Sequence, residues 1–360
     1  MNFDMPIAIL TQEDLIEAGC FDMKTAIDVT EDAFKKYACG DVIFPEKVSV
    51  IFDEVSQNRI NCLPAAILSE KVYGMKWISV FPDNPSKHGK PNISAVYLLS
   101  ELETGYPIAF LEGSMCSNMR TAAVGALAGK YLARNDSVNI GFIGAGEQAK
   151  SHFLAFKALF PDIKKCYVSS RTHASEHKFV EQMSRFHPDV EYIMCESNYE
   201  SAASNADIIV TAISGQEKIL RPEWIKRGAF YCHVAGLEDD FGVALSASKI
   251  VCDNWNIVKH RTQTISQMYK LGILHDKDIY ADLHEIVTGT KSGRDNDDEF
   301  IYFNSVGMSF VDTALSLWMY KKSLKLRSNY VSNVYYGGGG YVNFKTHSMF
   351  DILAEKLIMR

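Results

Sequence analysis

The chain has 360 residues, of which 47% are hydrophobic, so it is long enough to bury a full core and to form two domains. Its 37 basic and 44 acidic residues give a net charge of -7, which argues against a nucleic-acid or anionic-membrane partner. The eight cysteines are far apart and form no Cys-x-x-Cys pair, which argues against a zinc site. The N-terminus does not resemble a signal peptide, and no apolar run is long enough to span a membrane. We therefore expect a reduced, cytoplasmic protein.

The first third of the chain is predicted to consist mainly of strands with few helices between them. Apolar and β-branched residues dominate these segments, and Glu103-Thr-Gly105 is typical of a hairpin turn between the last two. This pattern indicates a mostly antiparallel sheet. The expected strands are 44–52, 59–67, 72–80, 92–100 and 106–113.

The middle of the chain alternates near-continuous apolar strands with helices, which predicts a parallel sheet covered on both faces. The expected strands are 138–146, 165–171, 190–195, 207–214, 229–236 and 249–255, with helices at 147–160 and 173–187. This alternation is typical of a doubly wound, Rossmann-type nucleotide-binding domain.

The predicted fold is therefore α/β, with a doubly wound parallel sheet and a second, mostly antiparallel α+β domain for substrate binding and dimerisation. We expect the Rossmann domain to span 121–305. Residues 1–120 form the other domain, completed by 306–360, of which 308–325 is expected to be a helix. The run Gly337–Gly340 lacks the lysine and hydroxyl of a P-loop, so we interpret it as a flexible turn.

A dinucleotide-binding motif opens the parallel domain. Gly144-Ala145-Gly146-Glu147-Gln148-Ala149 is G-x-G-x-x-A, and it joins a predicted strand to a predicted helix. The glycines permit a tight turn and close approach of a pyrophosphate, and the helix N-terminus supplies N–H donors. The alternative is an ordinary glycine-rich turn, which the strand–turn–helix context disfavours.

The end of the second parallel strand distinguishes NAD from NADP. NAD binding favours an acidic residue there, but the chain has Ser170-Arg171-Thr172. Arg171 can pair with a 2′-phosphate, with Ser170 and Thr172 as further donors. NADP is therefore favoured over NAD, although Arg171 stacked on adenine would fit either cofactor.

Lys76 lies in the middle of the apolar strand 72–80. A lysine in such a strand must reach water, pair with an anion or lose its charge. On strand statistics alone, a solvent-facing lysine is the simpler interpretation.

Longer stretches carry a family resemblance. The segments "GMKWISVFPDNPSK" (74–87), "ETGYPIAFLEGSMCSNMRTAAVGALA" (103–128), "IGFIGAGEQA" (140–149) and "FNSVGMSFVDTA" (303–314) together resemble the ornithine cyclodeaminase/μ-crystallin family. Within it, "DNPSK" and "VTGTKSGRDNDDE" are most similar to a branch from siderophore biosynthesis. That branch oxidatively cleaves N-(2-amino-2-carboxyethyl)-L-glutamate to 2,3-diaminopropionate and 2-oxoglutarate.

The resemblance implies an NAD(P)-dependent oxidoreductase acting on the C–N bond of an amino acid-derived substrate, as a homodimer joined through its N-terminal domains. It places Lys76 at the active-site lysine and Arg120 at the carboxylate-binding arginine, and it reverses the interpretation of Lys76 as a surface residue. The implied cofactor contacts are Thr121, Gly144, Ala145, Gly146, Glu147, Gln148 and Thr211, beside Ser170, Arg171 and Thr172.

The chain departs from the family pattern at three positions. Glu238, or alternatively Asp239, aligns with a catalytic aspartate, and the longer side chain weakens the case for cyclodeaminase activity. His233 stands where asparagine is common and is either an acid–base group or a structural histidine. The neutral Asn61 stands where the family often has an acid that would bind the side-chain amine of ornithine. The absence of that negative charge favours a more acidic substrate.

Lys47 and Arg59 are candidates for binding the extra carboxylates of a glutamate-like substrate, or are plain surface charges. The predicted function is oxidative hydrolysis of the secondary amine named above, with Lys76, Arg120 and Glu238 as catalytic residues. The alternatives are an imine or ketimine reductase, an opine-type synthase, an ornithine cyclodeaminase, and a non-catalytic NADPH-binding protein. The H-x-x-E-H match at His173–His177 is interpreted as a solvated helix start rather than a metal site.

Overall fold

The structure is a computed structural model that describes residues 7–53, 56–213, 215–326, 349–351 and 353. The predicted turn at Gly337–Gly340 lies outside these residues. The chain divides into two compact units, the first made of Met1–Arg120 with Met308–Arg360 and the second of Thr121–Gly307.

The first unit contains a seven-stranded sheet in the order β1-β7-β6-β5-β4-β2, with β3 paired to β4. Strands β2 to β7 pair antiparallel, and β1 alone runs parallel to its neighbour β7, so the predicted mostly antiparallel sheet is confirmed. The strands are β1 (Ala8–Leu10), β2 (Val42–Ile43), β3 (Val48–Asp53), β4 (Asn58–Ile67), β5 (Val72–Val80), β6 (Ile93–Glu101) and β7 (Pro107–Glu112).

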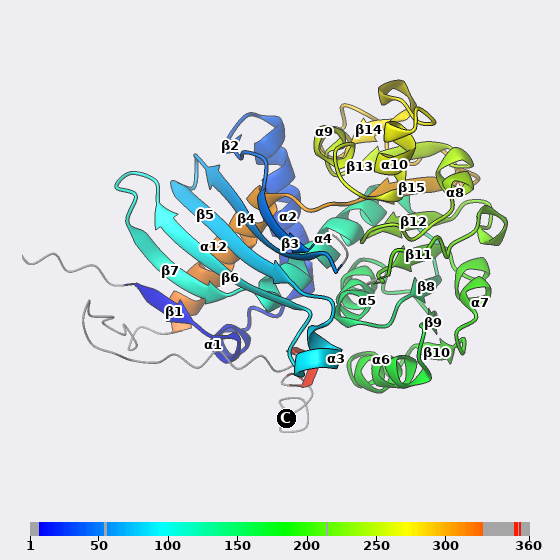
Figure 1. Ribbon diagram of the computed structural model, residues 1–360, viewed down its shortest axis with the longest axis horizontal. Helices are drawn as coiled ribbons and strands as arrows, with labels where there is room; N and C mark the ends of the chain where they lie inside the picture. Colours follow the sequence, from blue (N-terminus) through cyan, green and yellow to red (C-terminus); the bar gives the residue numbers. More distant parts are fainter. Residues whose placement is uncertain (1–6, 54–55, 214, 327–348, 352, 354–360) are drawn as a thin grey trace, which may run out of the picture. The chain divides into compact units, whose positions relative to one another are not determined.

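Helix α12 (Ser309–Leu326) packs against strands β4 to β7 and against α2 (Met23–Ala38) (Figure 1). The approach to the sheet is close at Gly74, where an added Cβ would lie 2.6 Å from Oγ1 of Thr313. Phe34 of α2 and Phe310 of α12 stack edge to face, with ring centroids 5.2 Å apart. Residues 309–319 of α12 are mostly apolar around the whole helix, and nearly all of them are buried. The unit also holds α1 (Gln12–Glu17) and α3 (Asn84–His88), and α4 (Ser114–Leu132) begins in it.

The second unit is built on an eight-stranded sheet in which every pairing is parallel, in the order β10-β9-β8-β11-β12-β15-β13-β14. The order reverses between β8 and β11, and this switch point is where doubly wound sheets bind ligands, beyond the carboxyl ends of the strands. The strands are β8 (Asn139–Ile143), β9 (Lys165–Ser169), β10 (Glu191–Met194), β11 (Ile208–Thr211), β12 (Phe230–His233), β13 (Lys249–Cys252), β14 (Ala281–Asp282) and β15 (Ile301–Asn304).

Helices connect these strands, as the sequence predicts. The helices are α5 (Glu147–Leu159), α6 (His173–Phe186), α7 (Tyr199–Ser204), α8 (Phe241–Leu245), α9 (Trp255–Val258), α10 (Thr264–Lys270) and α11 (Leu283–Val287), with 3-10 turns at Pro222–Trp224 and Asp276–Asp278. The doubly wound α/β fold is therefore confirmed.

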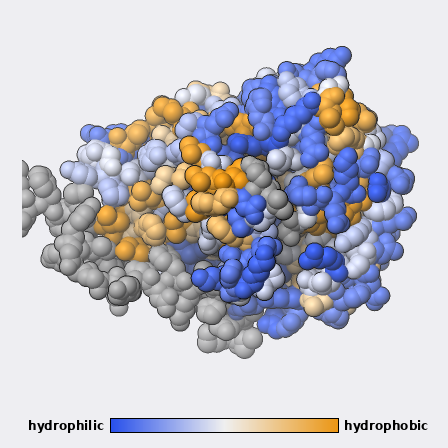
Figure 2. Space-filling model, in the orientation of Figure 1, coloured by the Kyte–Doolittle hydropathy of each residue, from blue (hydrophilic) through white to orange (hydrophobic). Residues whose placement is uncertain are grey.

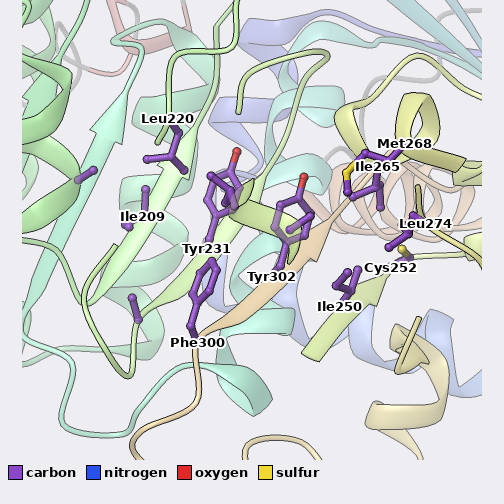
Figure 3. Packing of buried hydrophobic residues seen from close by; sticks show 14 of the residues in the cluster. Ile209, Leu220, Tyr231, Ile250, Cys252, Ile265, Met268, Leu274, Phe300 and Tyr302 are labelled. Atoms are coloured by element: carbon purple, nitrogen blue, oxygen red, sulfur yellow. The ribbon is translucent and has the colours of Figure 1, made fainter. Parts of the chain in front are cut away.

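One face of this sheet carries a core in which Tyr231 and Tyr302, from neighbouring strands, pack edge to face with centroids 5.0 Å apart (Figure 3). Ile250, Cys252 and Leu274 extend the same core toward β14. Within the described ranges, no helix is both long enough and apolar enough to cross a membrane.

Candidate functional site

Lys76 lies at the centre of β5, opposite Leu63 of β4 and Tyr97 of β6. Successive residues of a strand point to opposite faces, so Lys76 faces the side covered by α12 while Trp77 faces away. The side chain of Lys76 is only 1% exposed. The alternative that Lys76 points to solvent is therefore wrong, because the strand is covered on this face.

The anion that balances Lys76 is Asp312 of α12. Nζ of Lys76 lies 2.7 Å from Oδ2 of Asp312, whose side chain is also 1% exposed. Tyr97 donates its hydroxyl to Oδ1 of Asp312 at 2.6 Å. Nε of Arg120, in α4, lies 2.9 Å from the same oxygen. Four elements of the first unit thus bring two cations and a phenol onto one carboxylate.

The pKa values in this cluster follow from burial and from these contacts. Burial, with the neighbouring Arg120 cation, lowers the pKa of Lys76 to about 8, and Asp312 opposes that shift only in part. Burial alone would raise the pKa of Asp312, but Arg120 and Lys76 hold it below its usual value. Lys76 can therefore exchange a proton near neutral pH while Asp312 stays ionised.

Sequence reasoning missed Asp312, although it lies within a segment that carries the family resemblance. The available signal was a single acid in the apolar run "MSFVDTALSLWM" (308–319). A lone acid in a buried helix must be paired, but the sequence does not reveal its partner.

Arg59 and Asn61 lie on the same face of the sheet as Lys76, because Arg59, Asn61 and Leu63 alternate with outward-facing residues along β4. Asn61 is buried, and among the described residues its Oδ1 accepts no hydrogen bond. Arg59 is half-buried and donates from Nη1 to the carbonyl of Gln57 at 2.9 Å. Lys47 is half-buried and precedes β3.

The turn between β8 and α5 has the geometry of a phosphate cradle. Gly144 has φ +107°, and a Cβ there would lie 2.4 Å from the carbonyl oxygen of Ala212, so only glycine fits where the two switch-point loops meet. At Gly146 a Cβ would meet only open space. Gly146 is the N-cap of α5 and supplies no side-chain cap, so the helix N–H groups can face an anion. Glu147 pairs with Lys150 at 2.9 Å, and Ala145 is buried in the turn. These residues fit the pyrophosphate of a dinucleotide.

The loop after β9 holds Ser170, Arg171 and Thr172. Ser170 donates its hydroxyl to the carbonyl of Thr172 at 2.9 Å, and the Thr172 hydroxyl pairs with that of Ser175 at 2.8 Å. Arg171 is exposed, and within the described part of the chain its guanidinium makes no hydrogen bond or ion pair. The guanidinium is thus available to an anionic ligand.

Glu238 and Thr211 lie at the carboxyl edge of the parallel sheet and are both fully buried. Oε2 of Glu238 accepts hydrogen bonds from the Thr211 hydroxyl at 2.7 Å and from the N–H of Ala235 at 3.1 Å. Its Oε1 accepts from the N–H of Ile213 at 2.8 Å. Both oxygens therefore hold the loops after β11 and β12, and a direct role of Glu238 at the substrate stays a prediction.

His233 is also fully buried, at the end of β12. Its Nε2 lies 2.7 Å from the carbonyl of Gly236 and 3.2 Å from Oε2 of Glu238, and its Nδ1 lies 2.8 Å from the Tyr302 hydroxyl. Asp239 accepts a hydrogen bond from Thr264 at 2.5 Å, which ties it to α10. Although burial by itself lowers the pKa of His233, Asp239 and Glu238 raise it above its usual value. These contacts support the structural interpretation of His233.

Thr121 directly follows Arg120 in α4 and is half-buried. Gln148 lies in the first turn of α5 and is likewise half-buried. Among the residues that the structure describes, no group of histidines, cysteines or acids is arranged to hold a metal ion, including the H-x-x-E-H match.

The fold and these two sites define a class of dinucleotide-dependent enzyme, and comparison with known proteins gives the family. The sequence profile of the "Ornithine cyclodeaminase/mu-crystallin family" matches residues 8–326, so the chain belongs to this family. It is an NAD(P)-dependent oxidoreductase of the kind that acts on C–N bonds.

Individual relatives cover nearly the whole chain. N-((2S)-2-amino-2-carboxyethyl)-L-glutamate dehydrogenase of Staphylococcus aureus is 29% identical, over 93% of this chain and 100% of its own length. The structure of Thermococcus litoralis Δ1-pyrroline-2-carboxylate reductase with NADH and L-proline is 31% identical, with a TM-score of 0.84 over 89% of this chain and 98% of that one. An archaeal alanine dehydrogenase dimer with bound NAD is 29% identical, with a TM-score of 0.80 over 89% and 97%.

Proposed function

We propose that this enzyme oxidises the C–N bond of N-(2-amino-2-carboxyethyl)-L-glutamate and releases 2,3-diaminopropionate and 2-oxoglutarate, a step of siderophore biosynthesis. The observation that carries the proposal is the buried Lys76, which Asp312 and Arg120 surround and whose pKa is lowered to about 8. The 29% identity to the dehydrogenase of that substrate, along almost the whole chain, supports the choice of substrate.

The reaction needs a base, a cation for a carboxylate and a hydride acceptor. A nicotinamide dinucleotide supplies the acceptor when it is bound. The neutral amine of Lys76 takes the proton from the secondary amine nitrogen as the adjacent carbon loses its hydride, which leaves an imine. Water then adds across the C=N bond, and cleavage of the C–N bond yields the primary amine and the 2-oxo acid. Arg120 binds a substrate carboxylate, and Asp312 keeps the two cations compatible at close range.

The extra carboxylates of this substrate need further N–H donors. Arg59 and Asn61 face the same side of the sheet as Lys76, and each side chain carries N–H groups of the kind that donate to a carboxylate. We assign them to a second carboxylate, with Lys47 as an outer cation. Asn61 carries no charge that would attract a side-chain amine, which disfavours ornithine as the substrate.

In the second unit, the turn from Gly144 to Gln148 would hold the pyrophosphate, and Thr121 and Thr211 belong to the same cofactor region of the proposal. Arg171, with Ser170 and Thr172, would bind a 2′-phosphate, which favours NADP. Glu238 contributes by fixing the loops after β11 and β12.

We also propose a homodimer through the outer face of the first unit's sheet. Val48, Cys62, Trp77 and Val96 form one cross-strand row on the face opposite Lys76. Val48 is 63% exposed and Trp77 is 45% exposed. Figure 2 shows hydrophobic residues among those that cover these strands. An apolar sheet face of this kind is typical of an interface between subunits, and a solved relative is a dimer.

Imine reduction is the second candidate, because the structure of the reductase from Thermococcus litoralis is similar to this chain, with a TM-score of 0.84. The same residues would run the chemistry in reverse, with Lys76 donating the proton.

The test is the absorbance of reduced cofactor. Purified enzyme is mixed with NAD⁺ or NADP⁺ and the proposed amine, or with the reduced cofactors and Δ1-pyrroline-2-carboxylate. Net reduction of cofactor with the amine, lowered on the order of 100-fold in Lys76→Met and retained in Lys71→Met, would support oxidative cleavage. Lys71 is a fair control because its side chain is 77% exposed. If the enzyme oxidises reduced cofactor with the cyclic imine but does not reduce cofactor with the amine, imine reduction would replace the proposal.

A further inference from the structure

Glu176 is a fully buried carboxylate in α6 that lies close to the loop of Arg171. Its Oε1 accepts hydrogen bonds from the N–H of Ser170 at 2.7 Å and of Ser197 at 3.1 Å. Its Oε2 accepts from the N–H of Glu196 at 3.0 Å. One side chain thus joins the loop after β9 to the loop after β10.

The loop after β10 has an unfavourable backbone conformation that these bonds stabilise. Glu196 has φ +50° and Ser197 has φ +65°, although neither is glycine. The N–H of Asn198 donates to the carbonyl of Cys195 at 2.8 Å, which closes a turn with both residues at its centre. Successive N–H groups of such a turn converge and form an anion-binding nest, and here the carboxylate of Glu176 fills it.

Ser197 adds a second link to the Arg171 loop. Its hydroxyl donates to the carbonyl of Ser170 at 2.7 Å. The N–H and the carbonyl of Ser170 are therefore both fixed from outside their own loop, one residue before Arg171. The backbone that carries the free guanidinium of Arg171 is thus held in place before any ligand arrives.

The same contacts exclude another role for Glu176. It is the acid nearest in sequence after β9, where NAD-binding domains use a carboxylate to bind the ribose hydroxyls. Because both its oxygens accept from backbone donors inside the protein, it is not presented to a ribose.

We propose that Glu176 is a positioning residue that selects NADP over NAD, by holding the Ser170–Thr172 loop so that Arg171 can meet a 2′-phosphate without further ordering. This inference rests on the proposed assignment of Arg171 to that phosphate. Preorganisation of the loop favours the ligand whose extra phosphate is bound there, and it leaves the shared part of the dinucleotide unaffected.

The test measures dissociation constants of NADP⁺ and NAD⁺ by calorimetric titration, without turnover. Glu176→Gln keeps the shape but replaces one acceptor oxygen by a donor. It should raise the dissociation constant for NADP⁺ about tenfold and that for NAD⁺ less than about twofold. Glu181→Gln is the matched control, because Glu181 lies on the same helix with 65% exposure and pairs with Arg185. It should change neither constant. Hydrogen exchange at the amides of Ser170, Glu196 and Ser197 should accelerate in Glu176→Gln alone.

Arg171→Ala separates the two proposals. If it leaves the ratio of the two constants unchanged, the assignment of Arg171 to a 2′-phosphate fails, and this inference fails with it. If Arg171→Ala abolishes the preference but Glu176→Gln weakens both cofactors equally, weakens NAD⁺ more, or weakens neither, only the role of Glu176 is overturned. Should Glu176→Gln not fold, Ser197→Ala decides instead: a selective weakening of NADP⁺ supports the inference, and an unchanged ratio overturns it.

Discussion

Lys76 and Asp312 are separated by 236 positions in the sequence, and their charged atoms lie 2.7 Å apart with both side chains 1% exposed. A buried pair of this kind is strongly coupled to its surroundings, because little water screens it. Arg120 shares the same carboxylate, so two cations depend on one acid. The protonation of Lys76 is therefore sensitive to each neighbour.

The first prediction concerns the pH dependence of turnover. Lys76 is neutral above its pKa of about 8, so kcat/KM for amine oxidation should rise with pH to about 8 and then level off. Lys76→Met should lower kcat/KM on the order of 100-fold and remove this limb of the profile. A pH–rate profile of both proteins checks this, and an unchanged limb in Lys76→Met would assign the titration to another group.

The same pKa shift predicts how stability changes with pH. Between about 8 and the ordinary value of 10.5, unfolded Lys76 binds more protons than folded Lys76. The contribution of Lys76 to the free energy of unfolding should therefore increase as pH rises through this window, and it should be constant below about 8. Urea titrations of the wild type and of Lys76→Met at pH 7.5 and pH 9.5 measure this contribution as the difference between their free energies of unfolding. A difference that decreases from pH 7.5 to pH 9.5 would contradict the lowered pKa.

Asp312→Asn should destabilise the first unit, since Lys76 and Arg120 would face each other without a shared anion. The expected loss is about 3 kcal/mol in the free energy of unfolding at pH 7. Asp312 raises the pKa of Lys76, so its removal should also move the rising limb of the pH profile to lower pH. Asp32→Asn is the control: Asp32 is 61% exposed in an ion pair with Lys36, and it should cost less than about 0.5 kcal/mol. Equal losses in the two variants would show that burial does not govern the cluster.

Two glycine substitutions separate folding from cofactor binding. Gly144→Ala places a Cβ 2.4 Å from the carbonyl oxygen of Ala212 at a positive φ, so the melting temperature and the cofactor affinity should both fall. Gly146→Ala meets only open space, so the melting temperature should hold while the affinity falls about tenfold or more, because the methyl group occupies the approach of the pyrophosphate. Thermal melts and dinucleotide titrations measure both quantities. Unaltered affinity in Gly146→Ala would place the pyrophosphate elsewhere.

Val48→Lys tests the proposed dimer. A charge in the row of Val48 and Trp77 cannot be buried against a partner, so the variant should elute as a monomer in light-scattering chromatography. Leu271→Lys, at a residue that is 65% exposed in the second unit, should leave the oligomer intact. A dimer that persists in Val48→Lys would move the interface to another surface.

Much of the fold could be predicted because local patterns carry it. The strand–turn–helix around Gly144 and Gly146 has residues whose conformational needs are local, and the structure places the turn where the motif indicated. The strand around Lys76 was also predicted from composition. Composition did not show whether Lys76 faces solvent or the interior, because that depends on which side of β5 the distant helix α12 covers. Only the family resemblance indicated that Lys76 is not a surface residue.

The sequence by itself determined the alternation of strands and helices, the glycine-rich turn and the basic loop at Arg171, since each of these depends on neighbouring residues. The tertiary structure alone decided which acid pairs with Lys76, and that Glu176 turns inward to hold the Arg171 loop. It also decided that both carboxylate oxygens of Glu238 accept hydrogen bonds from groups of the protein. The physical reason is that the state of a buried charge depends on its desolvation and on the donors around it, and both are supplied by segments far away in the chain.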